Sequence, residues 1–175
     1  MYDVPRPAEL VDLDRTGDEL TTLSQFLDFH RSVLAHRAWG LSQTELATSL
    51  APSDLTLGGL LKHMAYVEDI WFHQRFLGNA PIEPWASADW DADADWEMTT
   101  AADNTPRQLF DQFDESCARS RTIAAAATLD QVSIVTRSDG IHWNLRWILV
   151  HMIEEYARHC GHADFIRQSI DGQVG

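Results

Sequence analysis

The stretch "NLRWILVHMIEEYARHCGHADFIRQSIDG", residues 144–172, carries the most strongly apolar helical pattern of the 175-residue chain. Apolar residues recur three and four positions apart, which predicts an amphipathic helix from about Asn144 to about Ile170. The expected buried stripe reads Leu145, Ile148, Met152, Glu155, His159, Ala163 and Ile166. A carboxylate on a buried face has to be paired, neutralised or bound to a metal. This helix therefore carries both the core pattern and an unusual polar pair.

Three further amphipathic patterns precede this helix. They cover about 18–37, a segment that follows Pro52 and Ser53 and ends near Leu77, and a segment that begins at Pro106 and fades within 124–127. Thr105 is a suitable N-cap, and proline suits the first helical position. Four long amphipathic helices favour an all-α four-helix bundle. We expect residues 1–175 to form one such domain, with a long crossover between its second and third helices.

The crossover, residues 79–104, contains three tryptophans and the acidic run "DWDADADWE", residues 89–97. A calcium loop that starts at Asp91 would need glycine at its sixth position and glutamate at its twelfth. Those positions hold Trp96 and Ala102, so an acidic surface loop is the better interpretation. The tryptophans suggest a lid over a pocket or an interface. Within 128–142, a short run of β-branched residues suggests a strand, although no partner strand is evident.

Composition excludes several classes of function. The formal net charge of −14 repels phosphate backbones, so we expect no nucleic-acid partner. No run of eighteen apolar residues is present, which predicts no membrane span. The two cysteines, Cys117 and Cys160, lack CxxC spacing and suggest no disulfide framework. The first residues lack the pattern of a signal peptide, and we therefore expect a cytoplasmic protein.

The spacing of Glu155 and His159 predicts that they share one helix face. Four residues on an α-helix correspond to about 40° of rotation and roughly 6 Å of rise. His63 borders the apolar stripe of the second long helix. If the second and fourth helices face each other, the three side chains converge inside the bundle. Two imidazoles and a carboxylate match both catalytic zinc sites and the facial triad of non-haem iron.

Structural roles are the alternative for the same residues. An inward histidine is more often a hydrogen-bonded core residue than a ligand. Glu155 can pair with Arg146 or Arg167, or it can lie at the edge of the stripe with its carboxylate in water. His151, four residues before Glu155, either orients that carboxylate or faces solvent.

Two stretches resemble the DinB/YfiT-like family: "TLGGLLKHMAYVEDIWF", residues 56–72, and residues 144–172. The likeness covers nearly the whole chain and is strongest to the DinB-like branch of unknown function. This resemblance implies a four-helix bundle, often dimeric, with a divalent metal held by three side chains. His63 and His159 match two of the family's usual three histidines. Glu155 replaces the third, as in the similar ligand set of the mycothiol-dependent maleylpyruvate isomerase N-terminal domain.

The resemblance implies a thiol S-transferase that uses mycothiol or a similar small thiol. Zinc is the expected metal, with nickel or iron as alternatives, and a metal-activated thiolate would attack a small electrophile. The expected partners are this thiol, the electrophile and a second copy of the chain. No catalytic residue beyond the ligands and no further cofactor site are assigned. A metal-dependent hydrolase, or a non-enzymatic stress-related protein that binds metal or other proteins, remain alternative functions.

Overall fold

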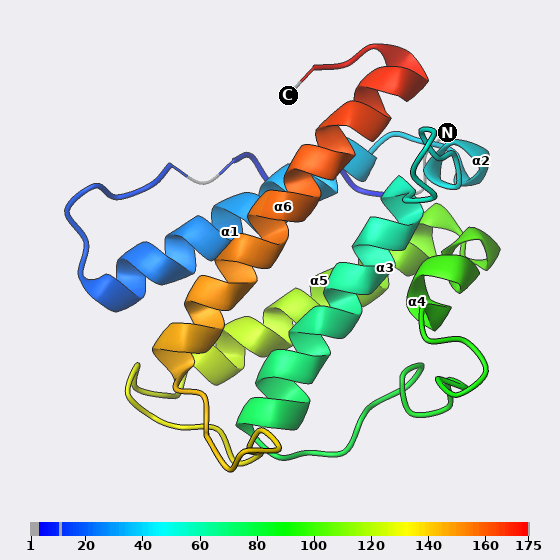
Figure 1. The fold of residues 1–175 in the computed structure, drawn as a ribbon. Coiled ribbons are helices and arrows are strands. Elements are labelled where there is room, and N and C mark those ends of the chain that lie inside the picture. Colours follow the sequence, from blue (N-terminus) through cyan, green and yellow to red (C-terminus); the bar gives the residue numbers. More distant parts are fainter. Residues whose placement is uncertain (1–3, 11, 175) are drawn as a thin grey trace.

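The computed structural model describes residues 4–10 and 12–174. Its long helical segments are α1 (Glu19–Ala38), α3 (Leu57–Glu68), the π-helical η1 (Asp69–Phe76), α5 (Pro106–Ala125) and α6 (Leu145–Asp171). Since η1 continues α3, these segments form four long rods, which lie side by side in Figure 1. The short elements are α2 (Gln43–Leu46), α4 (Trp96–Thr99) and the 3₁₀-helix η2 (Thr100–Asp103). The all-α four-helix bundle is confirmed.

Local capping sets the helix starts. Thr105 and Gln108 form a capping box, and Pro106 occupies the first turn of α5 as expected. The side chain of Asn144 accepts a hydrogen bond from the backbone N–H of Trp147 at 2.8 Å. The second long helix begins later than its predicted start after Ser53, because Thr56 provides the cap.

The junction of α3 and η1 was not predicted. The expected helix to Leu77 is present in extent, but its last two turns are π-helical from Asp69 onward. Glu68 and Asp69 lie at this junction and are 0% and 1% exposed. The carboxylate of Asp69 accepts a hydrogen bond from Gln74 in the same segment at 2.9 Å. The carboxylate of Glu68 is instead held by residues distant in sequence, which the helical period of the segment does not reveal.

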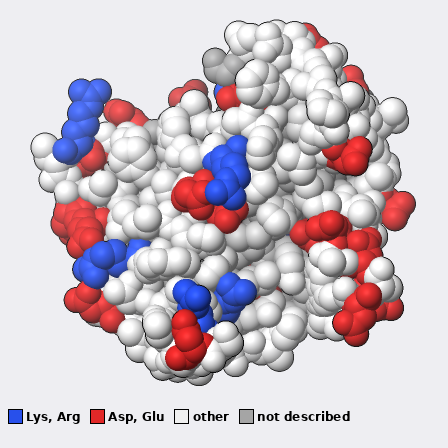
Figure 2. All heavy atoms as spheres, viewed as in Figure 1, with Lys and Arg blue, Asp and Glu red and all other residues white. Residues whose placement is uncertain are grey.

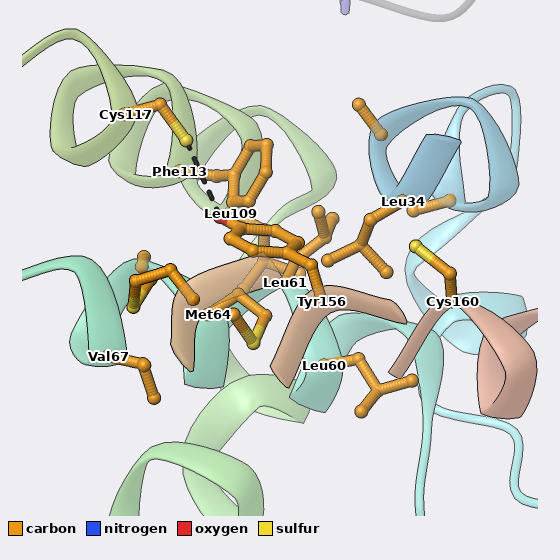
Figure 3. Close-up of a cluster of buried hydrophobic side chains, with 14 of the residues drawn as sticks. Leu34, Leu60, Leu61, Met64, Val67, Leu109, Phe113, Cys117, Tyr156 and Cys160 are labelled. Atoms are coloured by element: carbon orange, nitrogen blue, oxygen red, sulfur yellow. Dashed lines mark hydrogen bonds between the residues drawn. The ribbon is translucent and has the colours of Figure 1, made fainter. Parts of the chain in front are cut away.

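A buried polar network joins all four long helices. Arg31 on α1 donates to both carboxylate oxygens of Glu68 at 2.8 and 2.7 Å. The hydroxyl of Tyr156 on α6 donates to the same carboxylate at 2.8 Å. Cys117 on α5 lies with its sulfur 3.7 Å from that hydroxyl, the contact dashed in Figure 3. The network fixes how α6 is rotated about its own axis.

Apolar side chains from the long helices pack around this network. Figure 3 shows Leu60, Leu61 and Met64 of α3 in one cluster with Phe113 of α5 and Tyr156 of α6. Further buried members lie along the remaining turns of α1 and α6. The helices α3 and α6 run antiparallel, so the middle of one lies opposite the middle of the other (Figure 1). This places His63 and the stretch 155–159 at one level of the bundle.

The crossover packs tightly on α3. Trp85 is 2% exposed, and Trp90 stacks on Tyr66 with the ring centroids 4.5 Å apart. The ammonium of Lys62 lies 4.4 Å from the ring centroid of Trp96. The acidic residues largely remain at the surface and gather at the right of the view in Figure 2, over the crossover. This acidic segment is therefore anchored by its tryptophans.

The segment 128–142 forms no strand among the described residues. Val132 makes an isolated bridge with Asn144. The backbone N–H groups of Ile134 and Val135 donate to the carbonyls of Phe76 and Arg75 at 2.9 and 3.0 Å. The segment therefore provides hydrogen-bond donors for backbone carbonyls at the C-terminal end of η1. No helix in the described part of the chain is both long and apolar enough to cross a membrane.

Candidate metal site

The three predicted ligands lie near one another where α3 faces α6. The imidazole rings of His63 and His159 have centroids 5.0 Å apart and are inclined at 66°. The Glu155 carboxylate lies 3.7 Å from Nε2 of His159. The side chains of Glu155 and His159 are 19% and 12% exposed. These groups are therefore shielded but reachable from solvent.

The buried stripe of α6 differs from the prediction in its middle. Tyr156 is fully buried and Cys160 is 6% exposed, so these two residues occupy the core positions. Glu155 and His159, predicted at the centre of the stripe, lie at its edge. The rotation is favourable because the Tyr156 hydroxyl finds the carboxylate of Glu68 as a buried acceptor.

The proposed arginine partners of Glu155 are engaged elsewhere. Arg146 pairs with Glu19 and Asp130, and Arg167 pairs with Asp171. The close ionisable neighbours of Glu155 are instead His159 and His151, each 3.7 Å from one of its oxygens. His151 thus lies within reach of Glu155 and is half-buried, which favours the orienting role over the solvent-facing one.

A second group of donors shares Glu155. Within the described residues, only His151, Glu154 and Glu155 offer three donor atoms that all lie within 4.8 Å of one another. The donor atoms of His63, Glu155 and His159 do not all lie within this distance of one another. However, Glu154 is exposed and bound to Arg158, and its group comes from a single helix. The cross-helix set instead has shielded donors from two packed helices.

Glu97 of α4 orients His63. The Nδ1–H of His63 donates to Oε1 of Glu97 at 2.8 Å, and Glu97 is 4% exposed. The second carboxylate oxygen, Oε2, is buried and has no hydrogen-bond partner among the described residues. With Nδ1 engaged, Nε2 of His63 is the nitrogen left for a ligand, and such carboxylate–histidine pairs accompany metal sites.

The contact of Glu97 with His63 was not predicted from the sequence. The residue ends the acidic run and was counted with its exposed neighbours. Its helix, α4, has four residues, too few to show a period. The sequence feature that could have indicated Glu97 is the pair of tryptophans, Trp90 and Trp96. Their rings pack on Tyr66 and Lys62 of α3 and so hold this end of the crossover against that helix.

The electrostatics of the site favour neutral imidazoles. Burial, followed by the neighbouring His63 and His162, lowers the pKa of His159 to about 4. Burial also lowers the pKa of His151, against the opposing effect of Glu155. Both rings are therefore uncharged at neutral pH, which is the form that binds metals.

The cysteines of the chain are inert as nucleophiles. Burial, followed by the charge of Glu68, raises the pKa of the Cys117 thiol to about 12. Burial, followed by the charge of Asp164, raises that of Cys160 to about 12 as well. Neither provides a thiolate at neutral pH. Thiol chemistry at this site therefore requires a separate thiol molecule.

Aromatic side chains wall the site on two sides. Tyr66, stacked on Trp90, follows His63 by one turn of α3. On the other side, His151 stacks on Trp147 with ring centroids 5.0 Å apart and meets Trp71 edge-on at 4.5 Å. These rings make a surface suited to a small molecule with an apolar body.

The comparisons with known proteins agree with this architecture. A crystal structure of a conserved protein from Enterococcus faecalis superposes with a TM-score of 0.64 at 18% identity, covering 90% of this chain and 100% of that chain. At this identity the likeness shows a shared fold. A comparison with curated proteins gave no match. The family model described as Mycothiol-S-transferase matches residues 22–172. The chain therefore belongs to the mycothiol S-transferase family of DinB-like proteins.

Proposed function

We propose that this protein is a metal-dependent thiol S-transferase that joins a mycothiol-type thiol to a small electrophile. His63, Glu155 and His159 hold one divalent ion, with zinc as the expected metal. The observation that carries the proposal is the meeting of these three shielded donors from α3 and α6 in a chain of the mycothiol S-transferase family.

The donors suit zinc. Two imidazole nitrogens and one carboxylate form the three-ligand set of catalytic zinc sites, whose fourth position is open. His159 is neutral, and Glu97 directs Nε2 of His63 away from the crossover. The unpartnered buried oxygen of Glu97 is a further sign of fit, because a positive charge nearby would offset the cost of burying that carboxylate.

The residues divide the chemistry between them. A bound zinc ion would lower the pKa of a thiol at its open position enough to yield a thiolate at neutral pH. His151, neutral and half-buried beside Glu155, is an acceptor for the thiol proton. Trp71, 8% exposed, packs edge-on against His151 and would limit the access of bulk water to that ring. The sulfur electron pair forms the new S–C bond, and the leaving group departs with its own electron pair.

Conjugation of mycothiol to monochlorobimane by the zinc-loaded protein tests this proposal. We expect a fluorescent thioether to form faster than in the uncatalysed reaction, and the added rate to disappear in His159→Ala. Gln168→Ala is the control, because Gln168 is exposed on the same helix nine residues further on. If the fully zinc-loaded protein does not raise the rate of thioether formation above the uncatalysed rate, with monochlorobimane or with a panel of other electrophiles, the transferase proposal fails. Turnover of an ester without thiol would indicate hydrolysis instead.

Replacing Glu97 with alanine should weaken zinc binding by about 10- to 100-fold, the usual effect of removing a group that orients a ligand histidine. A competition titration against a chromogenic chelator measures this change. Asp91→Ala, in the exposed part of the same acidic run, is the control and should bind zinc like the wild type. Equal affinities for all three proteins, with unchanged circular dichroism, would mean that Glu97 only supports the fold.

A further inference from the structure

Arg75 differs from most cations of the chain in its surroundings. Most Lys and Arg side chains have a carboxylate within 4.0 Å. Arg75 has none among residues 4–10 and 12–174. Its guanidinium carbon instead lies 4.2 Å from the ring centroid of Trp71 and 5.3 Å from that of Trp143. A half-buried guanidinium is thus held by aromatic faces in a chain of net charge −14.

The backbone around Arg75 is well anchored. The residue lies in η1, where the π-helical path places it against Trp71, four residues earlier. Its carbonyl accepts a hydrogen bond from Val135 at 3.0 Å. Trp71 and Trp143 in turn meet edge-to-face, with centroids 5.2 Å apart. The guanidinium is therefore positioned in advance, which lowers the entropic cost of using it to bind a ligand. Single turns of π-helix also occur often at functional sites.

Arg75 and His151 contact the same ring, that of Trp71. The guanidinium carbon lies 4.2 Å from its centroid, and the centroid of the His151 ring lies 4.5 Å from it. His151 packs against Trp71 and Trp147 and lies 3.7 Å from Glu155. The guanidinium and the carboxylate of Glu155 thus border the same aromatic surface, with His151 between them.

Burial makes the unpaired state of Arg75 costly. Burial lowers its pKa, and Tyr66 is the neighbour that opposes this effect. Cation–π contacts offset part of this cost, but they leave the in-plane N–H donors of a guanidinium unused. These donors match the two oxygens of a carboxylate. We propose that Arg75 binds a carboxylate of the electrophile, so that the substrates are small organic acids whose apolar part rests on Trp71 and Trp147.

This inference rests on the proposed function, because it assigns the anion at Arg75 to the substrate of that reaction. The anion site itself can be tested without metal or thiol. NMR titrations of the metal-free protein with benzoate and benzamide compare two ligands of one shape that differ in charge. We expect benzoate to bind the wild type at least tenfold more tightly than it binds Arg75→Gln, and more tightly than benzamide binds. Arg137→Gln, at an exposed arginine paired with Asp139, should retain benzoate binding. Equal benzoate affinity in wild type and Arg75→Gln, or no preference over benzamide, would overturn the inference.

Turnover by the zinc-loaded protein then links this site to catalysis. The electrophiles are 4-(bromomethyl)benzoate and 4-(bromomethyl)benzamide with mycothiol, each corrected for its uncatalysed rate. We expect kcat/KM to favour the benzoate by at least tenfold in the wild type, and this ratio to fall close to one in Arg75→Gln. Transfer without a preference retains the proposed function and overturns this inference. Benzoate binding at Arg75 without any transfer leaves an anion site and removes the transferase.

Discussion

Glu155→Ala is expected to lose stoichiometric zinc, with an affinity at least about 100-fold below that of the wild type. Removing a group that only orients a ligand costs about 10- to 100-fold, and the loss of a direct ligand should exceed that range. The remaining pair, His63 and His159, offers two nitrogens and no negative charge to balance the ion. Elemental mass spectrometry of the purified and reconstituted proteins, followed by chelator competition, measures the effect.

Glu154→Ala is the matched control for this experiment. Glu154 is the adjacent carboxylate of α6, but it is exposed and bound to Arg158. It should retain one equivalent of zinc and the wild-type affinity. The opposite result, with zinc lost from Glu154→Ala and from His151→Ala but kept by His63→Ala, would assign the metal to the group on α6 alone. Zinc retained by Glu155→Ala would remove this residue from either site.

Glu68→Ala should destabilise the fold by about 3 to 5 kcal/mol, the usual cost of breaking a buried ion pair by removing one partner. Among the described residues, Arg31, 3% exposed, would keep only the partly exposed Asp28 as a counter-ion. The hydroxyl of Tyr156 would lose its acceptor as well. Urea denaturation followed by tryptophan fluorescence gives the change in the free energy of unfolding.

Two comparisons separate this effect from a general cost of losing a glutamate. Glu19→Ala removes an exposed partner of Arg146 and should cost less than about 1 kcal/mol. The double variant Arg31→Met/Glu68→Leu should recover at least half of the loss, because replacing both charges with apolar groups is often close to neutral. If Glu68→Ala costs no more than Glu19→Ala, the network contributes little to stability. Its role would then be limited to the orientation of α6.

Periodicity and capping were enough to find the long helices. The expected helices at 18–37 and 144–170 correspond to α1 and α6 within one or two residues at each end. Both the 3.6-residue period and an N-cap depend on residues within one or two turns, so a single sequence contains the necessary information.

The composition of the candidate site was only partly predictable. His63, Glu155 and His159 were found from their positions on two amphipathic faces and from the family resemblance. Glu97 and Arg75 were not found. One comes from a four-residue helix inside an acidic run, and the other depends on a π-helical path and on tryptophans distant in sequence. A helical period carries no information about which connection folds over a helix or which ring covers a cation.

By itself the sequence determined which segments are helical, where most of them begin and which residues can bind a metal. These properties arise from backbone hydrogen bonding and side-chain chemistry over a few neighbouring residues. Tertiary structure decided the rotation of α6, and with it the exchange of Glu155 and His159 for Tyr156 and Cys160 in the core. Two stripes about 100° apart on one helix differ little in apolar content here. The choice between them depends on a buried acceptor for the Tyr156 hydroxyl, which a distant helix supplies through Glu68.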